Sequence, residues 1–178
     1  MKSLSLEKII LCGHSLGGAI VISYYLEYPE DVEALILVGT GAKLRVHPLI
    51  FENLKNNFQE FLNSISVGAF YRKTDKEIIK RYIDDVAKLG PEVPYADFSI
   101  CDAFDELDAI KQGIIKVPTL IICGEADKLT PTKYSKFFHE NISNSYLNII
   151  KNAGHMVMME KPNEFNQIIE DFIKNKLN

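Results

Sequence analysis

Four short apolar runs, separated by polar and glycine-rich segments, form the framework of the sequence. The runs at residues 9–12, 35–39, 117–123 and 146–150 contain no charged residue and are dominated by Ile, Leu and Val. Continuous apolar runs of this length are typical of strands buried on both faces, as in a parallel sheet. Amphipathic segments lie between them, so strand and helix alternate. The pattern predicts an α/β fold in which a parallel sheet is flanked by helices.

Helical patterns occupy the stretches between these runs, and proline and capping residues mark their boundaries. A helix is expected over residues 16–28, where Pro29 stops it. With the runs on either side it forms a βαβ unit, which makes the two strands parallel. Another helix follows the third run, with Thr130 as its N-cap and Pro131 at its first position. The last helix starts near Pro162.

Residues 42–112 depart from this alternation because they contain helical patterns and no strand-like run. Thr74 and Glu77 form a capping box that opens one of these helices. We expect the segment to be a helical cap over the strand ends, inserted into an α/β core made of residues 1–41 and 113–178. The alternative is that the same helices flank the sheet. The aromatic residues of the segment either line an apolar pocket or form the cap's own core: Phe51, Phe58, Phe61, Phe70, Tyr71, Tyr82, Phe98 and Phe104.

The junction between the first run and its helix has the spacing Gly-x-Ser-x-Gly, at residues 13–17. In a strand-to-helix turn this tight, the serine backbone is strained and its hydroxyl stands clear of the chain. We expect Gly13 and Gly17 to be required where strand and helix crowd together, and Gly18 to keep the first helical turn small. The motif fixes only three positions, so an ordinary glycine-rich turn is the alternative.

Two further polar residues lie in equivalent positions, each just beyond the carboxyl end of an expected strand. Asp127 follows the third run, and His155 follows the fourth. Because the carboxyl ends of parallel strands meet at one edge of a sheet, Ser15, Asp127 and His155 are expected to converge there. A histidine can take the serine proton, while a carboxylate fixes its tautomer and stabilises the imidazolium. We therefore predict a catalytic triad with Ser15 as nucleophile, His155 as general base and Asp127 as the orienting acid.

Other titratable residues are given no catalytic role. Glu125 is the rival acid, close to Asp127 in sequence, and His14 is expected to pack beside the nucleophile. His47 and His139 lie away from any expected strand end. No metal is predicted, and the proposed chemistry requires no cofactor. Three evenly spaced acids are interpreted as a solvated helix face: Asp102, Asp105 and Asp108.

Residues 13–18, 124–127 and 152–155 resemble the elbow, acid loop and histidine loop of the α/β-hydrolase family, in its capped serine esterase and lipase branch. The resemblance covers nearly the whole chain. It implies an acyl-enzyme on Ser15 that is hydrolysed by water activated by His155. Family members with an aspartate at the elbow are dehalogenases and epoxide hydrolases, so the serine argues against those reactions. Ester, thioester, amide and C–C bond cleavage remain, of which carboxylic ester hydrolysis is our prediction.

The chain departs from that family because nothing before the elbow corresponds to its usual earlier strands, which makes this a partial α/β-hydrolase fold. The Leu16 backbone N–H supplies one oxyanion donor, and losing the other typically costs about 3 to 4 kcal/mol. The strand at 9–12 becomes an exposed apolar edge, which predicts pairing with a second copy or a complementing chain. The alternative function is therefore a truncated, non-catalytic remnant or interaction module that needs a partner. A third explanation is that Met1 is not the natural start.

Composition indicates which partners and which cellular location are expected for the protein. The sequence is 47% hydrophobic and 25% charged, with a formal net charge of −4 and no long run of one sign, which argues against a nucleic-acid partner. No stretch reaches the roughly 18 to 20 apolar residues of a membrane span, and a cytoplasmic location is expected. Cys12, Cys101 and Cys123 are expected to be buried free thiols. The expected partner is a small-molecule ester with an apolar acyl group.

Overall fold

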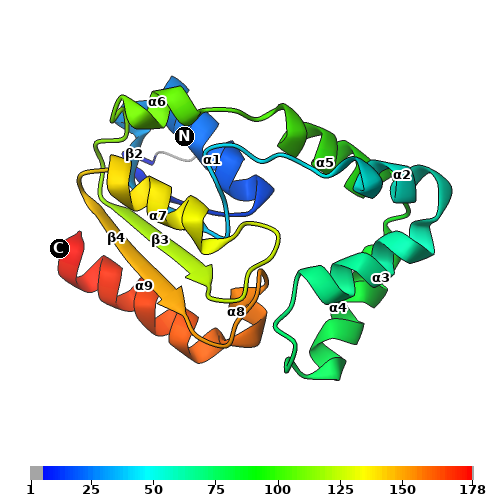
Figure 1. The fold of residues 1–178 in the computed structure, drawn as a ribbon. Helices are drawn as coiled ribbons and strands as arrows, with labels where there is room; N and C mark the ends of the chain where they lie inside the picture. The colour runs from blue at the N-terminus through cyan, green and yellow to red at the C-terminus, as the bar shows by residue number, and fades with distance from the viewer. Residues whose placement is uncertain (1–5, 178) are drawn as a thin grey trace.

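The computed structural model, which describes residues 6–177, is a parallel four-stranded sheet flanked by helices (Figure 1). The predicted α/β fold is confirmed, and each apolar run coincides with one strand. The strands pair in the order in which they occur along the chain, so β2 and β3 are interior and β1 and β4 form the edges. The strands are β1 (Ile9–His14), β2 (Val32–Val38), β3 (Thr119–Gly124) and β4 (Ser145–Ile150).

Helices cover both faces of the sheet. The face that carries Leu35 and Leu37 of β2 packs against Ile22 and Phe138 of two helices. Neighbouring residues of β2 point the other way, as the period of two in a strand requires. Each large side chain that is fully buried in this way contributes about 1.5 to 3 kcal/mol. On the first face lie α1 (Leu16–Glu27), α6 (Leu107–Lys111) and α7 (Thr132–Asn141); on the second lie α8 (Val157–Glu160) and α9 (Pro162–Lys176).

The second face is built from alternate residues of the interior strands. Ile36 of β2 and Ile122 of β3 are buried there with Phe172 of α9. A short 3₁₀ turn, η2 (Pro29–Asp31), links α1 to β2 where the predicted helix ends at proline. Layering of this kind places every interior strand between two apolar helical surfaces, which is why β2 and β3 are apolar along almost their whole length.

Most of the helices between β2 and β3 lie beyond the arrowheads of the strands, to one side of the sheet (Figure 1). They enclose a separate apolar cluster around Phe61, which packs against Phe58 and Phe98. By contrast, Ile110 of α6 is buried in the core of the sheet. The division into a core of residues 1–41 and 113–178 and a cap of residues 42–112 stays a prediction. The helices beyond the strand ends are α2 (Pro48–Asn56), α3 (Phe58–Gly68), α4 (Lys76–Lys88) and α5 (Glu92–Ala103).

Two of the predicted N-caps are wrong. Helix α4 is capped by Asp75, whose carboxylate accepts from the Glu77 backbone N–H at 2.9 Å, and not by Thr74. Helix α7 begins at Thr132, so Thr130 lies outside it. In both cases the threonine hydroxyl instead donates to a carboxylate, Thr74 to Glu160 and Thr130 to Asp127, and hydrogen bonds to a charged acceptor are stronger than those between neutral groups.

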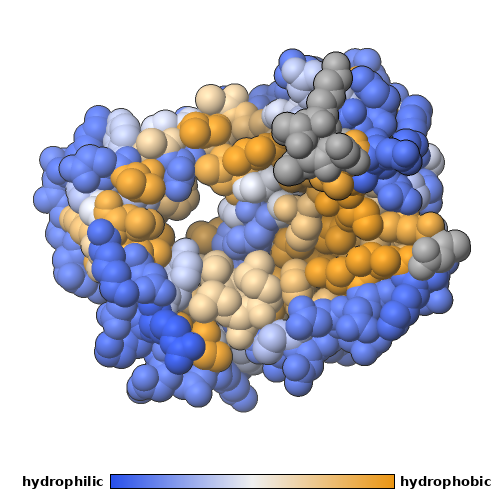
Figure 2. Space-filling model, turned by 180° about the vertical axis from the view of Figure 1, so that it is seen from behind, coloured by the Kyte–Doolittle hydropathy of each residue, from blue (hydrophilic) through white to orange (hydrophobic). Residues whose placement is uncertain are grey.

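Strand β1 is covered on one face only. Leu11 packs against the cluster beneath α1, whereas Ile10 and Cys12 point to the opposite face and are exposed. The apolar cluster on that face draws its residues from β2, β3, β4 and the last helices, and does not extend to β1. The prediction that Cys12 is buried is therefore wrong, while Cys101 and Cys123 are buried free thiols as expected. Figure 2, seen from behind, shows a continuous apolar area on this side of the molecule.

Surface ion pairs hold some of the charged residues within residues 6–177. Each of the three evenly spaced aspartates in this region lies beside a cation, in the pairs Asp102–Arg45, Asp105–Lys43 and Asp108–Lys111. Among the described residues, no helix combines the length and the apolar character that crossing a membrane requires.

Candidate active site

The turn that carries Ser15 is strained. Ser15 has φ 52° and ψ −117°, a backbone conformation that side-chain-bearing residues rarely adopt. Two contacts with neighbouring segments hold it, because Ser15 N–H donates to the Val38 carbonyl at 2.9 Å and the Thr40 hydroxyl donates to the Ser15 carbonyl at 2.8 Å. The strain is thus offset by hydrogen bonds from the end of β2 and the loop after it.

Close packing explains two of the three glycines in this turn. A Cβ on Gly13 would lie 2.1 Å from the Gly17 carbonyl oxygen, and a Cβ on Gly18 would lie 2.5 Å from the Thr40 side chain. Nothing lies within 4 Å of a Cβ on Gly17. The predicted crowding at Gly17 is therefore wrong: the strand meets the helix backbone at Gly13, and the neighbouring loop approaches at Gly18.

Asp127 is buried in a shell of hydrogen-bond donors at the end of β3. Its Oδ1 accepts from the backbone N–H groups of Leu129 and Thr130, both at 2.9 Å. Its Oδ2 accepts from the Thr130 hydroxyl at 2.8 Å and from His155 Nδ1–H at 2.9 Å. Burial raises the pKa of the Asp127 carboxyl, but hydrogen bonds from His155 and Thr130 outweigh it, so the pKa lies below its usual value. The carboxylate is therefore ionised at neutral pH.

His155 lies in the loop after β4 and is held at both its ring and its backbone. Its Nδ1–H is shared between Asp127 and the Thr130 hydroxyl oxygen, which lies 3.2 Å away. This bonding places the proton on Nδ1 and leaves Nε2 free to accept one. The His155 backbone N–H donates to the Ala69 carbonyl at 2.8 Å, which ties the loop to the end of α3.

His14, beside Ser15, contacts His155 directly. The two ring centroids are 4.5 Å apart, and His14 Nε2–H donates to the His155 carbonyl at 3.0 Å. Burial, together with the nearby His155 ring, lowers the pKa of His14 to about 4. His14 is therefore neutral across the physiological range and serves as a hydrogen-bond donor that joins the elbow to the histidine loop.

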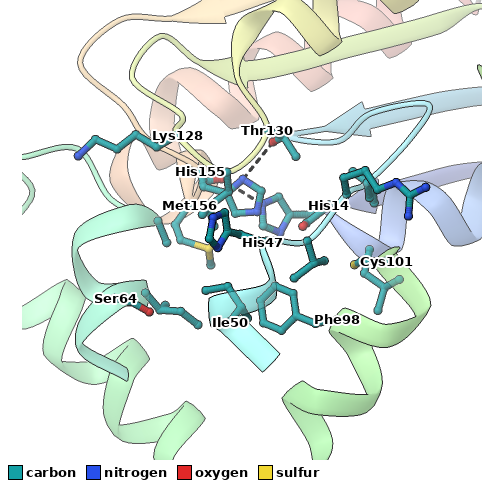
Figure 3. Close-up of a pocket in the computed structure, with 18 of the residues that line it drawn as sticks. His14, His47, Ile50, Ser64, Phe98, Cys101, Lys128, Thr130, His155 and Met156 are labelled. Carbon is teal, nitrogen blue, oxygen red and sulfur yellow. Dashed lines mark hydrogen bonds between the residues drawn. The ribbon is translucent and has the colours of Figure 1, made fainter. Parts of the chain in front are cut away.

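Ser15 and His155 line one cavity of about 600 Å³ between the sheet edge and the helices beyond it. Within residues 6–177 the Ser15 hydroxyl makes no hydrogen bond with His155; such contacts often tighten only when substrate binds. The Leu16 N–H, first in α1, has no intrahelical acceptor and lies at the same wall. Figure 3 shows Thr130 bonded to the His155 ring, with His14 beside it.

The rest of the cavity wall is largely apolar. Ile50 and Phe98 face the site from the helices and Met156 from the loop after β4, while Lys128 extends away from the other labelled side chains (Figure 3). Of the aromatic residues considered from the sequence, Tyr82 and Phe98 line the cavity, and the others lie outside its wall. Burial, with the nearby carboxylates of Asp97 and Asp102, raises the pKa of the Cys101 thiol to about 11, so this wall residue stays protonated.

The structure therefore brings Asp127 to His155 and leaves the rival Glu125 exposed. His139 bonds Ser145, away from the cavity. His47 lines the cavity and also caps α2, a position that strand-end reasoning missed. Within residues 6–177, no cluster of three or more His, Cys, Asp or Glu side chains is arranged to hold a metal ion.

Two residues that support the site were missed from the sequence, Thr130 and Glu160. The spacing Asp-x-x-Thr was a usable signal for the first, because a side-chain hydroxyl three residues after a carboxylate can reach it within one turn. The carboxylate of Glu160 accepts from the backbone N–H of Gly154, beside His155, at 2.7 Å. No local sequence pattern marks Glu160, because the other donors to its carboxylate, Tyr71 and Thr74, lie in a distant segment of the sequence.

Comparison with known proteins shows which family the chain resembles. A family model described as "Serine aminopeptidase, S33" (Hydrolase_4) matches residues 2–162. A solved structure described as that of a thermophilic esterase is 43% identical, with a TM-score of 0.91, and the match covers 99% of this chain and 69% of that one.

Two sequence relatives carry names for different reactions. A proline iminopeptidase of Saccharolobus solfataricus is 28% identical, across 94% of this chain and 62% of its own length. The 2-hydroxy-6-oxo-6-phenylhexa-2,4-dienoate hydrolase of Comamonas testosteroni is 27% identical, across 99% of this chain and 66% of its own. The chain thus spans about two-thirds of the length of these relatives.

Proposed function

Because the chain belongs to the α/β-hydrolase family, within the group described as serine aminopeptidase S33, we propose that it hydrolyses a carboxylic ester through an acyl-enzyme on Ser15. The main support is the hydrogen bond between His155 and Asp127, beside a cavity that Ser15 also lines. The likeness to a thermophilic esterase favours an ester over the other bonds that this chemistry can cleave.

Each residue of the triad has one task in the proposed reaction. Ser15 Oγ attacks the ester carbonyl carbon while His155 Nε2 takes its proton, and Nε2 then gives that proton to the departing alcohol oxygen. A water molecule next attacks the acyl carbon, losing its proton to Nε2, which returns one to Ser15 Oγ as the acid leaves. Asp127 keeps the imidazole in the required tautomer and stabilises the imidazolium between these steps.

The negative charge that develops on the ester oxygen requires donors at the elbow. The Leu16 N–H is available for this because it begins α1, whose N-terminus also carries a partial positive charge. One donor of this kind is worth about 3 to 4 kcal/mol in the transition state. Within residues 6–177 we assign the role of oxyanion donor to the Leu16 N–H and to no second backbone N–H. We therefore expect residues 6–177 by themselves to hydrolyse an ester more slowly than a site with two such donors would.

The cavity wall indicates the substrate class. Ile50, Phe98 and Met156 present apolar surface to the space in front of Ser15, and a volume of about 600 Å³ is in the range of small-molecule sites. We therefore propose an ester with an apolar acyl group. A series of p-nitrophenyl esters of increasing chain length tests this, because a flat profile of kcat/KM would contradict an apolar acyl pocket.

A second candidate function, an interaction module without catalysis, is favoured by the exposed apolar edge strand. Ile10 and Cys12 of β1 face solvent, and unpaired edges of this kind pair readily with another strand. The partner would be a second copy or a chain that supplies further strands. Light scattering over a range of concentrations tests for the second copy, and a monomer at every concentration would exclude it.

The test of the proposed function is labelling with a fluorophosphonate, which reacts with activated serines and requires no knowledge of the substrate. Intact mass is measured for the wild type and for Ser15→Ala. We expect one adduct on the wild type and none on the variant. A wild type that stays unlabelled would contradict the proposal and favour the interaction module.

A further inference from the structure

The carboxylate of Glu160, at the end of α8, joins two segments that are far apart in the sequence. Its Oε1 accepts from the Gly154 backbone N–H at 2.7 Å. Its Oε2 accepts from the Tyr71 backbone N–H at 2.8 Å and from the Thr74 hydroxyl at 2.5 Å. One half-buried side chain therefore binds the loop that carries His155 and the segment between α3 and α4.

Backbone contacts draw the same two segments together. The backbone N–H groups of His155 and Met156 both donate to the Ala69 carbonyl, at 2.8 and 3.1 Å. The approach is so close that a Cβ on Gly154 would lie 2.7 Å from the Tyr71 nitrogen. The histidine loop is thus packed against residues 69–74 without room for a side chain between them, and Glu160 spans both sides of this contact.

The charge on Glu160 makes this arrangement specific. An ionised carboxylate has two oxygens that only accept, and here the oxygens face two backbone donors and one hydroxyl. Within the described part of the chain Glu160 forms no ion pair, so its contacts with the protein are those with these three donors. Hydrogen bonds to a charged acceptor are roughly twice as strong as those between neutral groups. An amide at this position, with an NH₂ group in place of one oxygen, could not accept from all three donors.

We propose that Glu160 is a positioning residue for His155, which fixes the catalytic histidine by clamping its loop to residues 69–74 at the base of the helices above the cavity. This inference rests on the proposed function of His155. Loss of the clamp frees Gly154, directly before the histidine, so the ring shifts relative to Ser15. A displacement of about 1 Å in a group that must be precisely placed lowers the rate about 100-fold.

The experiment compares Glu160→Gln with three further variants. Glu160→Gln keeps the shape but replaces one acceptor with a donor. Thr74→Val removes one of the three donors and leaves the carboxylate, whereas Thr74→Ser keeps the hydroxyl. Glu164→Gln, at an exposed position in the first turn of α9, is the matched control for the change of charge.

Two quantities are measured on each folded variant: the second-order rate constant for fluorophosphonate labelling, and the ¹H NMR resonance of the His155 Nδ1–H, assigned by its absence in His155→Ala. We expect Glu160→Gln to slow labelling about 100-fold and to shift or broaden the resonance. Thr74→Val should slow labelling about tenfold. Thr74→Ser and Glu164→Gln should match the wild type in both measurements.

The outcomes separate this inference from the proposed function. If Glu160→Gln lowers the melting temperature but leaves the labelling rate and the resonance unchanged, Glu160 is only structural and the inference is wrong. If the wild type is unreactive yet the resonance responds to Glu160→Gln and not to Glu164→Gln, the proposed function fails while the positioning role stands.

Discussion

The two halves of the candidate site are built in different ways. The half that contains Asp127 and His155 is closed by short hydrogen bonds, four of them to one carboxylate. The half that contains Ser15 has a strained backbone, a hydroxyl with no hydrogen bond to His155, and an edge strand exposed on one face. The Asp127 and His155 side chains are therefore held by their own hydrogen bonds, whereas Ser15 is held through its backbone, by two hydrogen bonds and by the close packing at Gly13 and Gly18.

This difference indicates where each half is vulnerable. A strained φ such as that of Ser15 costs about 1 to 3 kcal/mol, which the surrounding packing must offset. The acid–histidine half is also closely packed, because a Cβ on Gly124 would lie 2.1 Å from the Gly154 carbonyl oxygen, and it depends in addition on a charge and its donors. Changes that alter volume should therefore damage both halves, whereas changes that alter side-chain hydrogen bonding should damage mainly the acid–histidine half.

The largest expected effect is that of Asp127→Asn. The amide cannot stabilise the imidazolium and presents a donor to Thr130 or to His155, so the tautomer with Nδ1–H is no longer favoured. If the proposed triad operates, we expect the rate of fluorophosphonate labelling to fall about 10⁴-fold. Glu125→Asn, at the exposed rival position, should stay within about twofold. Equal losses in both variants would contradict the assignment of the acid.

The elbow is tested by a pair of glycine substitutions whose local surroundings differ. Gly13→Ala drives a methyl group into the Gly17 carbonyl, 2.1 Å away, so strand and helix must separate. We expect it to lower the free energy of unfolding by at least about 3 kcal/mol. Gly17→Ala meets no atom within 4 Å and should raise it by about 0.4 to 1 kcal/mol, because alanine is the better helix former. Urea denaturation measures both, and similar values would disprove the steric account.

Much of this site was predictable from the sequence because strand ends and turn residues are local signals. The apolar runs gave the strands, and the parallel order brought Ser15, Asp127 and His155 to one edge, where the structure has Asp127 and His155 hydrogen-bonded. The strain at Ser15 also followed from its motif. These features depend on residues within one element or on a general property of parallel sheets.

Most of what the sequence did not predict depends on contacts between distant segments. Thr74 resembles an N-cap, yet it donates to the half-buried carboxylate of Glu160, which is far away in the sequence. The exposure of Cys12 follows from which helices reach β1, a property of the assembled layers and not of the run itself. Thr130 is the exception, because its partner Asp127 lies only three residues away and the spacing was a usable signal.

The contact between the two halves is tested by the pH dependence of stability. Because the pKa of His14 is about 4 in the folded protein against 6.5 as the ordinary value, the unfolded chain binds a proton that the folded one does not. Stability is therefore full above pH 6.5 and is lost as the pH falls toward 4, by about 3 kcal/mol. His155 and Asp127 both face His14, so the test compares two proteins over the same pH range and not one protein at two pH values.

His14→Gln keeps a donor for the His155 carbonyl and removes the titrating group. We expect the free energy of unfolding of this variant to fall by about 3 kcal/mol less than that of the wild type between pH 6.5 and pH 4. Parallel curves for the two proteins would mean that His14 is protonated as readily in the folded state as in the unfolded chain.

The smallest effect expected is at Thr130, whose hydroxyl donates to Asp127 and shares the His155 Nδ1–H. Thr130→Val keeps the branched shape and the backbone donor but removes the hydroxyl, so Asp127 keeps three of its four hydrogen bonds. One bond to a charged acceptor is worth about 1.5 to 3 kcal/mol, of which only the part that changes as imidazolium forms affects the rate. We expect labelling to slow about tenfold, and Thr130→Ser to restore it.

Because the hydroxyl also stabilises the Asp127 carboxylate, the acid limb of the pH–rate profile should move to higher pH in Thr130→Val. An unchanged rate and an unmoved profile in Thr130→Val would mean that Thr130 only fills space, and the acid–histidine half would then be held by fewer bonds than its geometry indicates.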